Sequence, residues 1–354
     1  MRTLLSWMPS FATAKGLRRG GNVGCKVGLA AMALLATAGG VARSQAAVVS
    51  FGSGANAFNM EFVTIGNPGN AADTTGAPNS AGAVGYTYGI GKFEVSEDMI
   101  TKYNANFGTA NSLAITKDTR GPNKPATGVS WNEAARFVNW LNTSSGGFAA
   151  YKFTTGGVND NIALWTATDT LDYDASNPYR SKRATYVLPS YNEWYKAAYY
   201  DPSNSTYYNF ATGSDTAPTS VASGTGTGVN GNNEAVYEDR PPADVNLAGG
   251  FSPYGVMGLG GNVREWQESS SDLANNSGSS SRVFRGGGWA DSSSNLSSSS
   301  LHPGNPFDGN GALGFRVASL SSSDPPAVPE PTSMAIFGLG ALGMAYRARR
   351  KSKA

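Results

Sequence analysis

The stretch from Ser252 to Trp266 constrains the fold of this chain more than any other, with the sequence Ser-Pro-Tyr-Gly-Val-Met-Gly-Leu-Gly-Gly-Asn-Val-Arg-Glu-Trp. Its glycines at 258, 260 and 261 allow left-handed backbone or the close approach of another segment, and the run after them alternates like a strand. Glu265 is therefore expected on a strand face beside glycine carbonyls. Those oxygens are suitable ligands for a hard cation such as calcium. Composition alone favours the other interpretation, a buried glycine corner whose glutamate is paired within the protein.

Glu265 is flanked by Val263 and Trp266, so we expect its side chain to be largely buried. A buried carboxylate needs a cation or several hydrogen-bond donors. The candidate partners are Arg285, Arg316 and a bound calcium ion. We predict that Glu265 holds the corner at 260–266 together, with calcium as an optional partner.

Several sequence blocks follow one another along the chain. The first three are Tyr-Gly-Ile-Gly-Lys-Phe-Glu-Val-Ser at 88–96, the helix-like block at 125–141 and Leu-Pro-Ser-Tyr-Asn-Glu-Trp at 188–194. The C-terminal signature consists of Gly-Asn-Val-x-Glu-Trp at 261–266, Arg-Val-Phe-Arg-Gly-Gly-Gly-Trp at 282–289 and Gly-Phe-Arg-Val at 314–317. In this order the blocks resemble the formylglycine-generating enzyme (sulfatase-modifying factor) family, and the resemblance spans roughly residues 58–320.

The resemblance implies an α+β fold over residues 47–320, irregular and rich in loops, with short strands and a few capped helices related to the C-type lectin core. Local patterns agree, because strands are expected at 48–51, 58–65 and 86–95 and a helix capped by Ser96 at 97–107. Ser130 with Glu133, and Ser190 with Glu193, predict capping boxes, so both glutamates are interpreted as structural. Residues 146–183 have no recognisable chemistry and are interpreted as an insertion.

The active members of the resembled family bind copper through a cysteine pair and oxidise a substrate cysteine. The corresponding positions here are Asp291 and Leu296, and the chain's one cysteine, Cys25, precedes the predicted mature body. His302 is the only histidine. We therefore expect no copper, zinc or iron and no formylglycine-generating activity.

The calcium pattern of the resembled family transfers in part. It implies the carbonyls of Gly261 and Val263 and the carboxylate of Glu265 as metal ligands. The position of a further side-chain ligand is Gly258, which has no side chain, and Arg264 stands where the family usually has tryptophan. We expect a weak, partial calcium site at most.

The two ends of the chain carry targeting patterns. Residues 1–46 combine basic residues, an apolar run and small residues before Ala47, which predicts a secretory signal peptide. A Ser/Pro linker at 321–330 precedes a tail at 331–354 with an apolar run and a basic end. Pro-Glu-Pro at 329–331 makes this tail resemble the PEP-CTERM sorting signal, which implies processing by an exosortase and transient membrane contact; a permanent anchor is the alternative.

The net charge changes once both ends are set aside. The whole chain has 27 basic and 25 acidic residues, but 1–46 holds six of the cations and 347–354 five more. The remaining body has 16 basic and 25 acidic residues, a net charge of −9. Such a body repels phosphate backbones, so nucleic-acid binding is not expected.

The leading hypothesis is an exported, non-catalytic module of the bacterial envelope or the extracellular space. Its long loops are rich in Tyr, Trp, Asn and Ser, which suits a glycan, another extracellular polymer or a protein as ligand. The alternative is an enzyme, for example a glycan hydrolase, using two carboxylates about 5 to 10 Å apart in one cleft. Its candidate residues are Asp291, Asp308, Glu238, Asp239 and Glu265.

Overall fold

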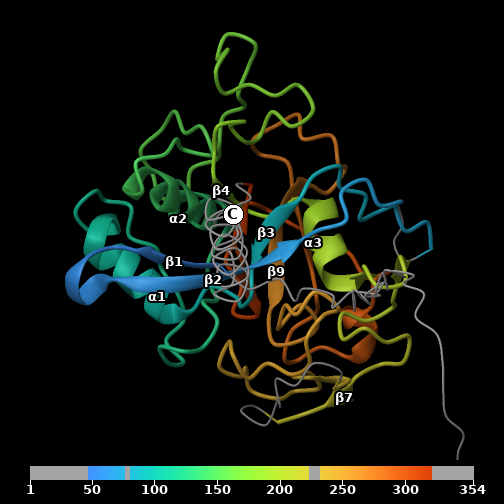
Figure 1. Ribbon diagram of the computed structural model, residues 1–354. Helices are drawn as coiled ribbons and strands as arrows, with labels where there is room; N and C mark the ends of the chain where they lie inside the picture. The colour runs from blue at the N-terminus through green and yellow to red at the C-terminus, as the bar shows by residue number, and fades with distance from the viewer. Residues whose placement is uncertain (1–46, 76–79, 223–231, 321–354) are drawn as a thin grey trace, which may run out of the picture. The chain divides into compact units, whose positions relative to one another are not determined.

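The computed structural model describes residues 47–75, 80–222 and 232–320, which belong to one compact unit (Figure 1). The predicted signal peptide, linker and sorting tail lie outside these residues. Among the helices of the described residues, none has the length and apolar character needed to cross a membrane.

The first sheet has five strands in the order β1-β2-β3-β13-β4, all antiparallel to their neighbours. Its strands are β1 (Ala47–Phe51), β2 (Phe58–Ile65), β3 (Tyr88–Gly91), β13 (Ala318–Ser319) and β4 (Tyr186–Val187). The expected strands at 48–51 and 58–65 are confirmed. The expected strand at 86–95 is shorter, because the chain leaves the ladder after Gly91.

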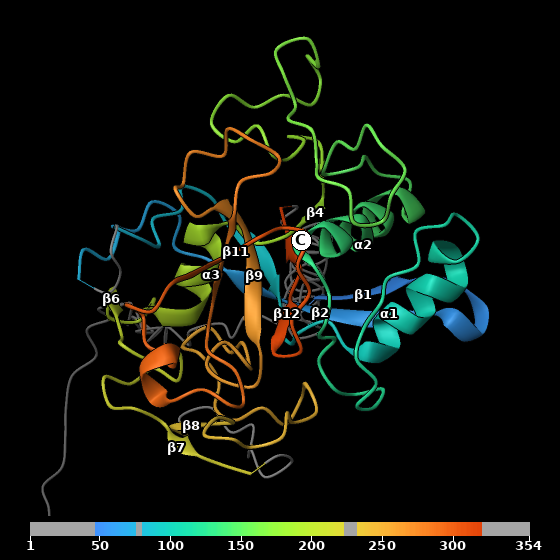
Figure 2. The same cartoon turned by 180° about the vertical axis from the view of Figure 1, so that it is seen from behind.

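The second sheet has four strands in the order β11-β10-β9-β12, and β9 and β12 run parallel. Its strands are β11 (His302–Gly304), β10 (Arg282–Arg285), β9 (Arg264–Ser270) and β12 (Leu313–Phe315). Figure 2 shows β9 and β12 side by side, between α3 and α2. The strand expected after the glycine turn is therefore present as β9.

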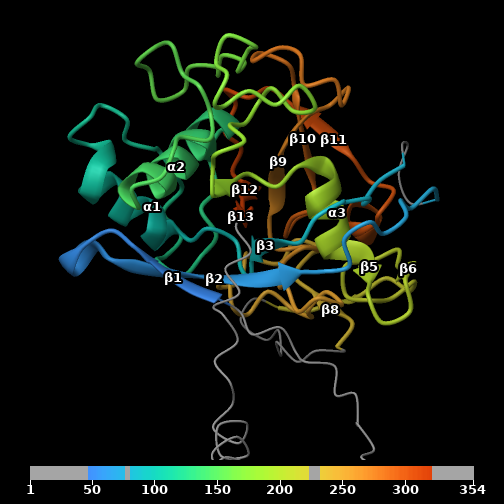
Figure 3. The ribbon, with the colours of Figure 1, turned by 45° about the horizontal axis from the view of Figure 1, so that its top comes forward.

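Three helices pack against the sheets: α1 (Glu97–Tyr103), α2 (Trp131–Ser144) and α3 (Tyr191–Tyr199). The predicted helix at 97–107 continues from α1 into one π-helical segment, Asn104–Gly108. Both predicted capping boxes are confirmed, at Ser130 with Glu133 and at Ser190 with Glu193. In Figure 3, α1 and α2 lie next to the β1–β2 hairpin and α3 lies next to β5.

The remaining elements are short pieces in long loops. They are the 3-10 turns Gly54–Asn56 and Ser293–Leu296 and the paired strands β5 (Tyr200–Asp201) with β6 (Thr206–Tyr207) and β7 (Thr219–Ser220) with β8 (Glu234–Ala235). Segment 146–183 contains isolated bridges but neither helix nor longer strand. The fold is thus the irregular, loop-rich α+β arrangement that the sequence predicted.

One short segment connects the two sheets. Strand β12 belongs to the second sheet and β13, which starts three residues later, belongs to the first. Arg316 lies between them, and its side chain is fully buried. A long cation at the junction of two sheets must find its partners inside the protein.

Candidate functional site

Glu265 is fully buried in β9 and is paired within the protein. Arg316 donates from Nε to Oε2 and from Nη2 to Oε1, both at 2.6 Å. The indole N–H of Trp194 donates to Oε2 at 2.7 Å. This two-pronged guanidinium–carboxylate contact is the strongest kind of protein ion pair, and it confirms Arg316 as one of the expected partners.

Arg316 also connects the glycine corner to the first sheet through hydrogen bonds. Its Nη1 donates to the carbonyl of Gly91 at 2.7 Å, and its Nη2 to the carbonyl of Met257 at 2.8 Å. Gly91 ends β3, and Met257 lies in the glycine stretch. Glu265 and Arg316 together therefore connect both sheets and the corner.

Arg285, the other candidate partner, does not bond to Glu265. Its guanidinium donates to the carbonyls of Ser298 and Ser300 at 2.8 and 2.7 Å and to the Tyr191 hydroxyl. Arg285 and Glu265 are opposite one another in the β10–β9 register, but the Arg285 side chain binds the serine-rich loop that contains Ser298 and Ser300.

A second buried carboxylate, Glu94, stands beside the same corner. Its Oε1 accepts from Asn262 Nδ2 at 2.9 Å, and the side chain is 1% exposed. A Cβ at Gly258 would lie 2.4 Å from Glu94 Oε1, and Gly258 has a φ of +77°. Glycine is thus required at 258 for two reasons, its backbone conformation and the carboxylate that fills the space above it.

The contacts of Glu265 decide how well calcium fits at Gly261, Val263 and Glu265. Both carboxylate oxygens face the Arg316 guanidinium, and a metal ion cannot share that edge of the carboxylate with it. Among the described residues no group of three or more His, Cys, Asp or Glu side chains is placed to hold a metal ion. The residues therefore do not fit a calcium ion bound through Glu265 in this arrangement, and calcium binding at the corner stays a prediction.

If calcium does bind at the corner, we expect it to raise the free energy of unfolding only slightly. At the affinity typical of extracellular modules, about 10⁻⁴ to 10⁻³ M, roughly 5 mM calcium adds about 1 to 2 kcal/mol to the free energy of unfolding. Thermal melting in calcium and in chelator measures this difference. A gain above about 4 kcal/mol would make calcium an essential part of the fold.

The two positions that correspond to the family's copper-binding cysteines, Asp291 and Leu296, make structural contacts in this protein. Asp291 accepts two hydrogen bonds from the Arg264 guanidinium, one of them from Nε at 2.8 Å, and one from the amide of Gly288 at 2.7 Å. Leu296 is fully buried and packs with Ala235 and Tyr237. Arg264 stands where the family usually has tryptophan, so two departures from the family pattern form one ion pair.

The other carboxylates proposed for an enzyme do not gather with Glu265. Glu238 and Asp239 are exposed, and both adopt left-handed backbone in a turn. Asp308 is exposed and accepts from the Asn305 amide at 3.0 Å. Glu238 does lie next to Asp291, because its amide donates to the carbonyl of Asp291 at 2.9 Å. A catalytic carboxylate pair among these five residues stays a hypothesis.

A different carboxylate pair surrounds the buried Arg180. Arg180 bonds to Glu193 at 3.0 Å and to Glu268 at 3.4 Å, and both carboxylates are fully buried. Burial raises the pKa of Glu268, whereas Arg180 and other hydrogen-bond donors lower that of Glu193 despite its burial. A cavity of about 300 Å³ reaches Arg180, but neither glutamate lines it. These carboxylates hold insertion 146–183 to α3 and β9 and do not face a ligand.

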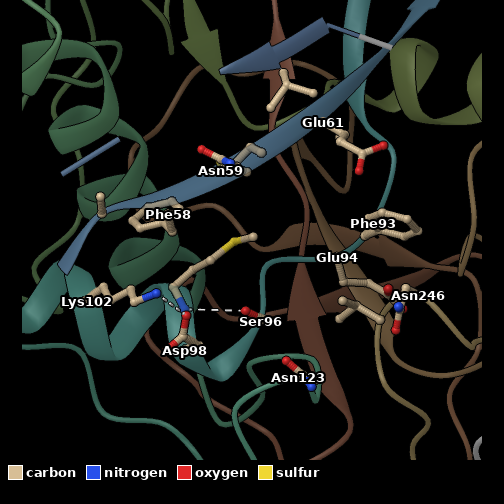
Figure 4. Close-up of a pocket in the computed structure, with 16 residues that line it drawn as sticks. Phe58, Asn59, Glu61, Phe93, Glu94, Ser96, Asp98, Lys102, Asn123 and Asn246 are labelled. Carbon is tan, nitrogen blue, oxygen red and sulfur yellow. Dashed lines mark hydrogen bonds and ion pairs between the residues drawn. The ribbon is translucent and has the colours of Figure 1, made fainter. Parts of the chain in front are cut away.

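A pocket of about 720 Å³ opens between β2, the segment after β3, the start of α1 and the loops at 123 and 245–246 (Figure 4). Figure 4 shows Glu94 beside Asn246 on one side and Asp98 with Lys102 on another. The side-chain amides of Asn123 and Asn246, both exposed, form no hydrogen bonds with the described residues. Phe93, half-buried, adds an aromatic surface.

The carboxylates in this pocket differ in their surroundings. Glu61 pairs with Lys92 at 3.0 Å, and Asp98 pairs with Lys102 at 2.8 Å. Glu94 has no such partner, and burial raises its pKa to about 7 even though nearby Arg316 lowers it. The pocket can therefore offer amides, an aromatic ring and an unpaired carboxyl to a ligand.

Sequence reasoning missed this pocket and Glu94. Strand alternation at 86–95 would place Glu94 on the face opposite Phe93 and Val95, but these residues follow the end of β3, where alternation no longer applies. The sequence held one indication. Position 258 is glycine where the resembled family has a side-chain ligand, and in the structure the Glu94 carboxylate occupies the space of that side chain.

Comparison with known proteins supports the fold. The sulfatase-modifying factor enzyme 1-like domain matches residues 45–320, and the PEP-CTERM protein-sorting motif matches residues 327–351. No curated protein sequence matches the chain significantly.

Among solved structures, Treponema denticola variable protein 1 is similar, with a TM-score of 0.52 and 19% identity over 77% of this chain and 98% of that one. CarF has a TM-score of 0.49 and 20% identity over 73% of this chain and 98% of its own. PvdO from Pseudomonas aeruginosa has a TM-score of 0.45 and 17% identity, over 77% and 97% of the two chains. At such identities only the fold of the first is informative.

The sorting motif indicates export to the cell envelope and implies processing by an exosortase. The domain match covers most of the chain and agrees with the two sheets and capped helices described above. The chain therefore belongs to the sulfatase-modifying factor enzyme 1-like domain family, and it carries a PEP-CTERM sorting motif.

Proposed function

We propose that this protein is an exported, non-catalytic binding module, and that its ligand is an extracellular glycan held in the pocket of Figure 4. One observation supports the proposal most strongly. The side-chain amides of Asn123 and Asn246 form no hydrogen bonds with the described residues, and they line a pocket of about 720 Å³ together with Phe93. Amides and carboxylates hydrogen-bond to sugar hydroxyls, and an aromatic ring covers the apolar face of a sugar.

A glycan array with the exported protein tests this proposal. We expect binding to a limited set of glycans and expect the double variant Asn123→Ala/Asn246→Ala to lose it. The control Asn305→Ala removes an exposed amide that does not line the pocket, and it should bind like wild type. Absence of binding by wild type, or equal binding by all three proteins, would contradict the proposal.

A second candidate, carboxylate-based glycan hydrolysis, is favoured by one observation. Three acidic residues line the pocket, and the pKa of one of them, Glu94, is raised to about 7. However, Glu61 and Asp98 are each committed to a lysine. Shortened products after long incubation with an array-positive glycan would favour hydrolysis, and intact glycan would favour binding alone.

We predict no formylglycine-generating activity. Asp291 and Leu296 cannot act as thiolates, because neither side chain contains sulfur; the first is bound by Arg264 and the second is buried. A sulfatase-type peptide incubated with the protein, copper and oxygen should return unmodified in mass spectrometry. Product above a protein-free control would contradict this.

Export leads to a processing prediction. The exported form should begin at Ala47 and lack everything from about Pro331, because both ends match cleavable targeting patterns. Intact-mass measurement of native material tests both cuts. Material that retains the apolar tail would show that the sorting motif serves as an anchor.

A further inference from the structure

Glu94 is the most unusual residue of the pocket in Figure 4. Its side chain is 1% exposed, and its Oε2 has no hydrogen-bond partner among the described residues. An unpaired buried carboxylate oxygen is unfavourable, since it has lost water and gained no donor. Because Glu94 is one of the residues that line the pocket, a ligand bound there can supply the missing donor.

The charges around Glu94 show which donor is missing. Arg316 is the nearby cation, but its guanidinium donates to Glu265, Gly91 and Met257 and not to Glu94. Glu265 carries the same charge as Glu94 and raises its pKa further. Lys102, which lines the pocket, is paired with Asp98, and the neighbouring Lys92 is paired with Glu61. The described surroundings therefore leave one carboxylate without a cation in contact.

A metal ion is the less suitable cation. Calcium needs six to eight oxygen ligands, and the described residues offer no group of three acidic or histidine side chains for a metal. A primary ammonium group needs only about three acceptors, which one carboxylate and neighbouring amide oxygens can provide. Asn246 lies beside Glu94 with its amide uncommitted.

We infer that the pocket recognises a glycan through a primary ammonium group, placing the amine of a de-N-acetylated amino sugar against Glu94 and its hydroxyls against Asn123 and Asn246. This inference rests on the proposed glycan binding and narrows it to one chemical class. The body's net charge of −9 favours the approach of such a cationic polymer.

The test compares two oligosaccharides that differ only in the amine, a glucosamine oligomer and its N-acetylated counterpart. Calorimetric titration of the exported protein should show the free-amine oligomer binding roughly 30-fold tighter or more, as for other close charge pairs shielded from water. Glu94→Gln keeps the shape of the side chain and should abolish this preference. Equal binding of the two oligomers would overturn the inference while leaving glycan binding in place.

A matched control separates recognition from general attraction between charges. Glu238→Gln makes the same change at an exposed residue outside the pocket and should keep the preference for the amine. Loss of the preference in both variants, or in neither, would overturn the inference. Failure of wild type to bind either oligomer or any array glycan would overturn the proposed function as well.

A second pocket variant covers the case in which Glu94→Gln does not fold. Asn246→Lys changes an exposed side chain and places an ammonium group of the protein beside Glu94. It should lose the preference for the free amine. A lysine-rich peptide serves as the last probe, and peptide binding tighter than that of the glucosamine oligomer would overturn the assignment to a sugar.

Discussion

Glu265→Ala is expected to lower the free energy of unfolding by about 3 to 5 kcal/mol. The substitution leaves the fully buried Arg316 without its carboxylate and the indole N–H of Trp194 without its acceptor. Because the partner is an arginine of the same chain, the loss should be nearly the same in calcium and in chelator. Chemical denaturation under both conditions measures it.

A surface ion pair provides the control for Glu265→Ala. Glu61 and Lys92 form a partly exposed pair, and Glu61→Ala should change stability by less than about 1 kcal/mol. The double variant Glu265→Ala/Arg316→Met should recover part of the loss, since no unpaired charge then remains. A single variant as stable as wild type would show that Glu265 does not hold the corner.

Arg180→Met is the second change with a large expected effect, about 3 to 5 kcal/mol at pH 8. Without the guanidinium, Glu193 and Glu268 are two like charges in the interior. Their pKa values should both rise above the unfolded values. A raised folded pKa means that stability falls as pH increases from the unfolded pKa through the folded one, so the loss should be smaller at pH 5.

The control for Arg180→Met is Arg183→Met, three residues away. Arg183 pairs with Asp172 at 2.8 Å and is partly exposed, so its replacement should have a small effect at both pH values. Denaturation of the three proteins at pH 5 and pH 8 gives the comparison. A loss for Arg180→Met that does not grow with pH would contradict the role assigned to the two glutamates.

Local patterns made much of the fold predictable. The capping boxes at Ser130 and Ser190 act within three residues, so the sequence alone identifies the starts of α2 and α3. Strand β2 was predictable because its alternation and its bounds are local. The end of β3 was not, because the carbonyl of its last residue, Gly91, accepts a hydrogen bond from Arg316, a residue 225 positions away.

The site was predictable only in part, for the same physical reason. The expected burial of Glu265 followed from its neighbours in β9, but three partners were equally acceptable until the fold placed Arg316 against it. The pocket joins residues from β2, the segment after β3 and two distant loops. No local pattern links Asn123 to Asn246, although the amide of the neighbouring Val245 donates to the carbonyl of Asn123 at 2.9 Å.

The two unusual residues Arg264 and Asp291 have a structural explanation that could not be predicted from the sequence. Asp291 alone is an unsuitable ligand, and Arg264 alone is an unusual residue for its position. The structure shows that each is the partner of the other, in a pair whose carboxylate is 10% exposed. The family fold is therefore combined with an ion pair between these two positions.

A crystal structure of the exported protein with an array-positive glycan tests the central claim most directly, namely that this fold binds a glycan in the pocket between β2 and α1. The proposal predicts sugar density against Phe93, Asn123 and Asn246, with Arg316 still bound to Glu265. Sugar density beside Asp291 and Trp289, with the pocket empty, would contradict it.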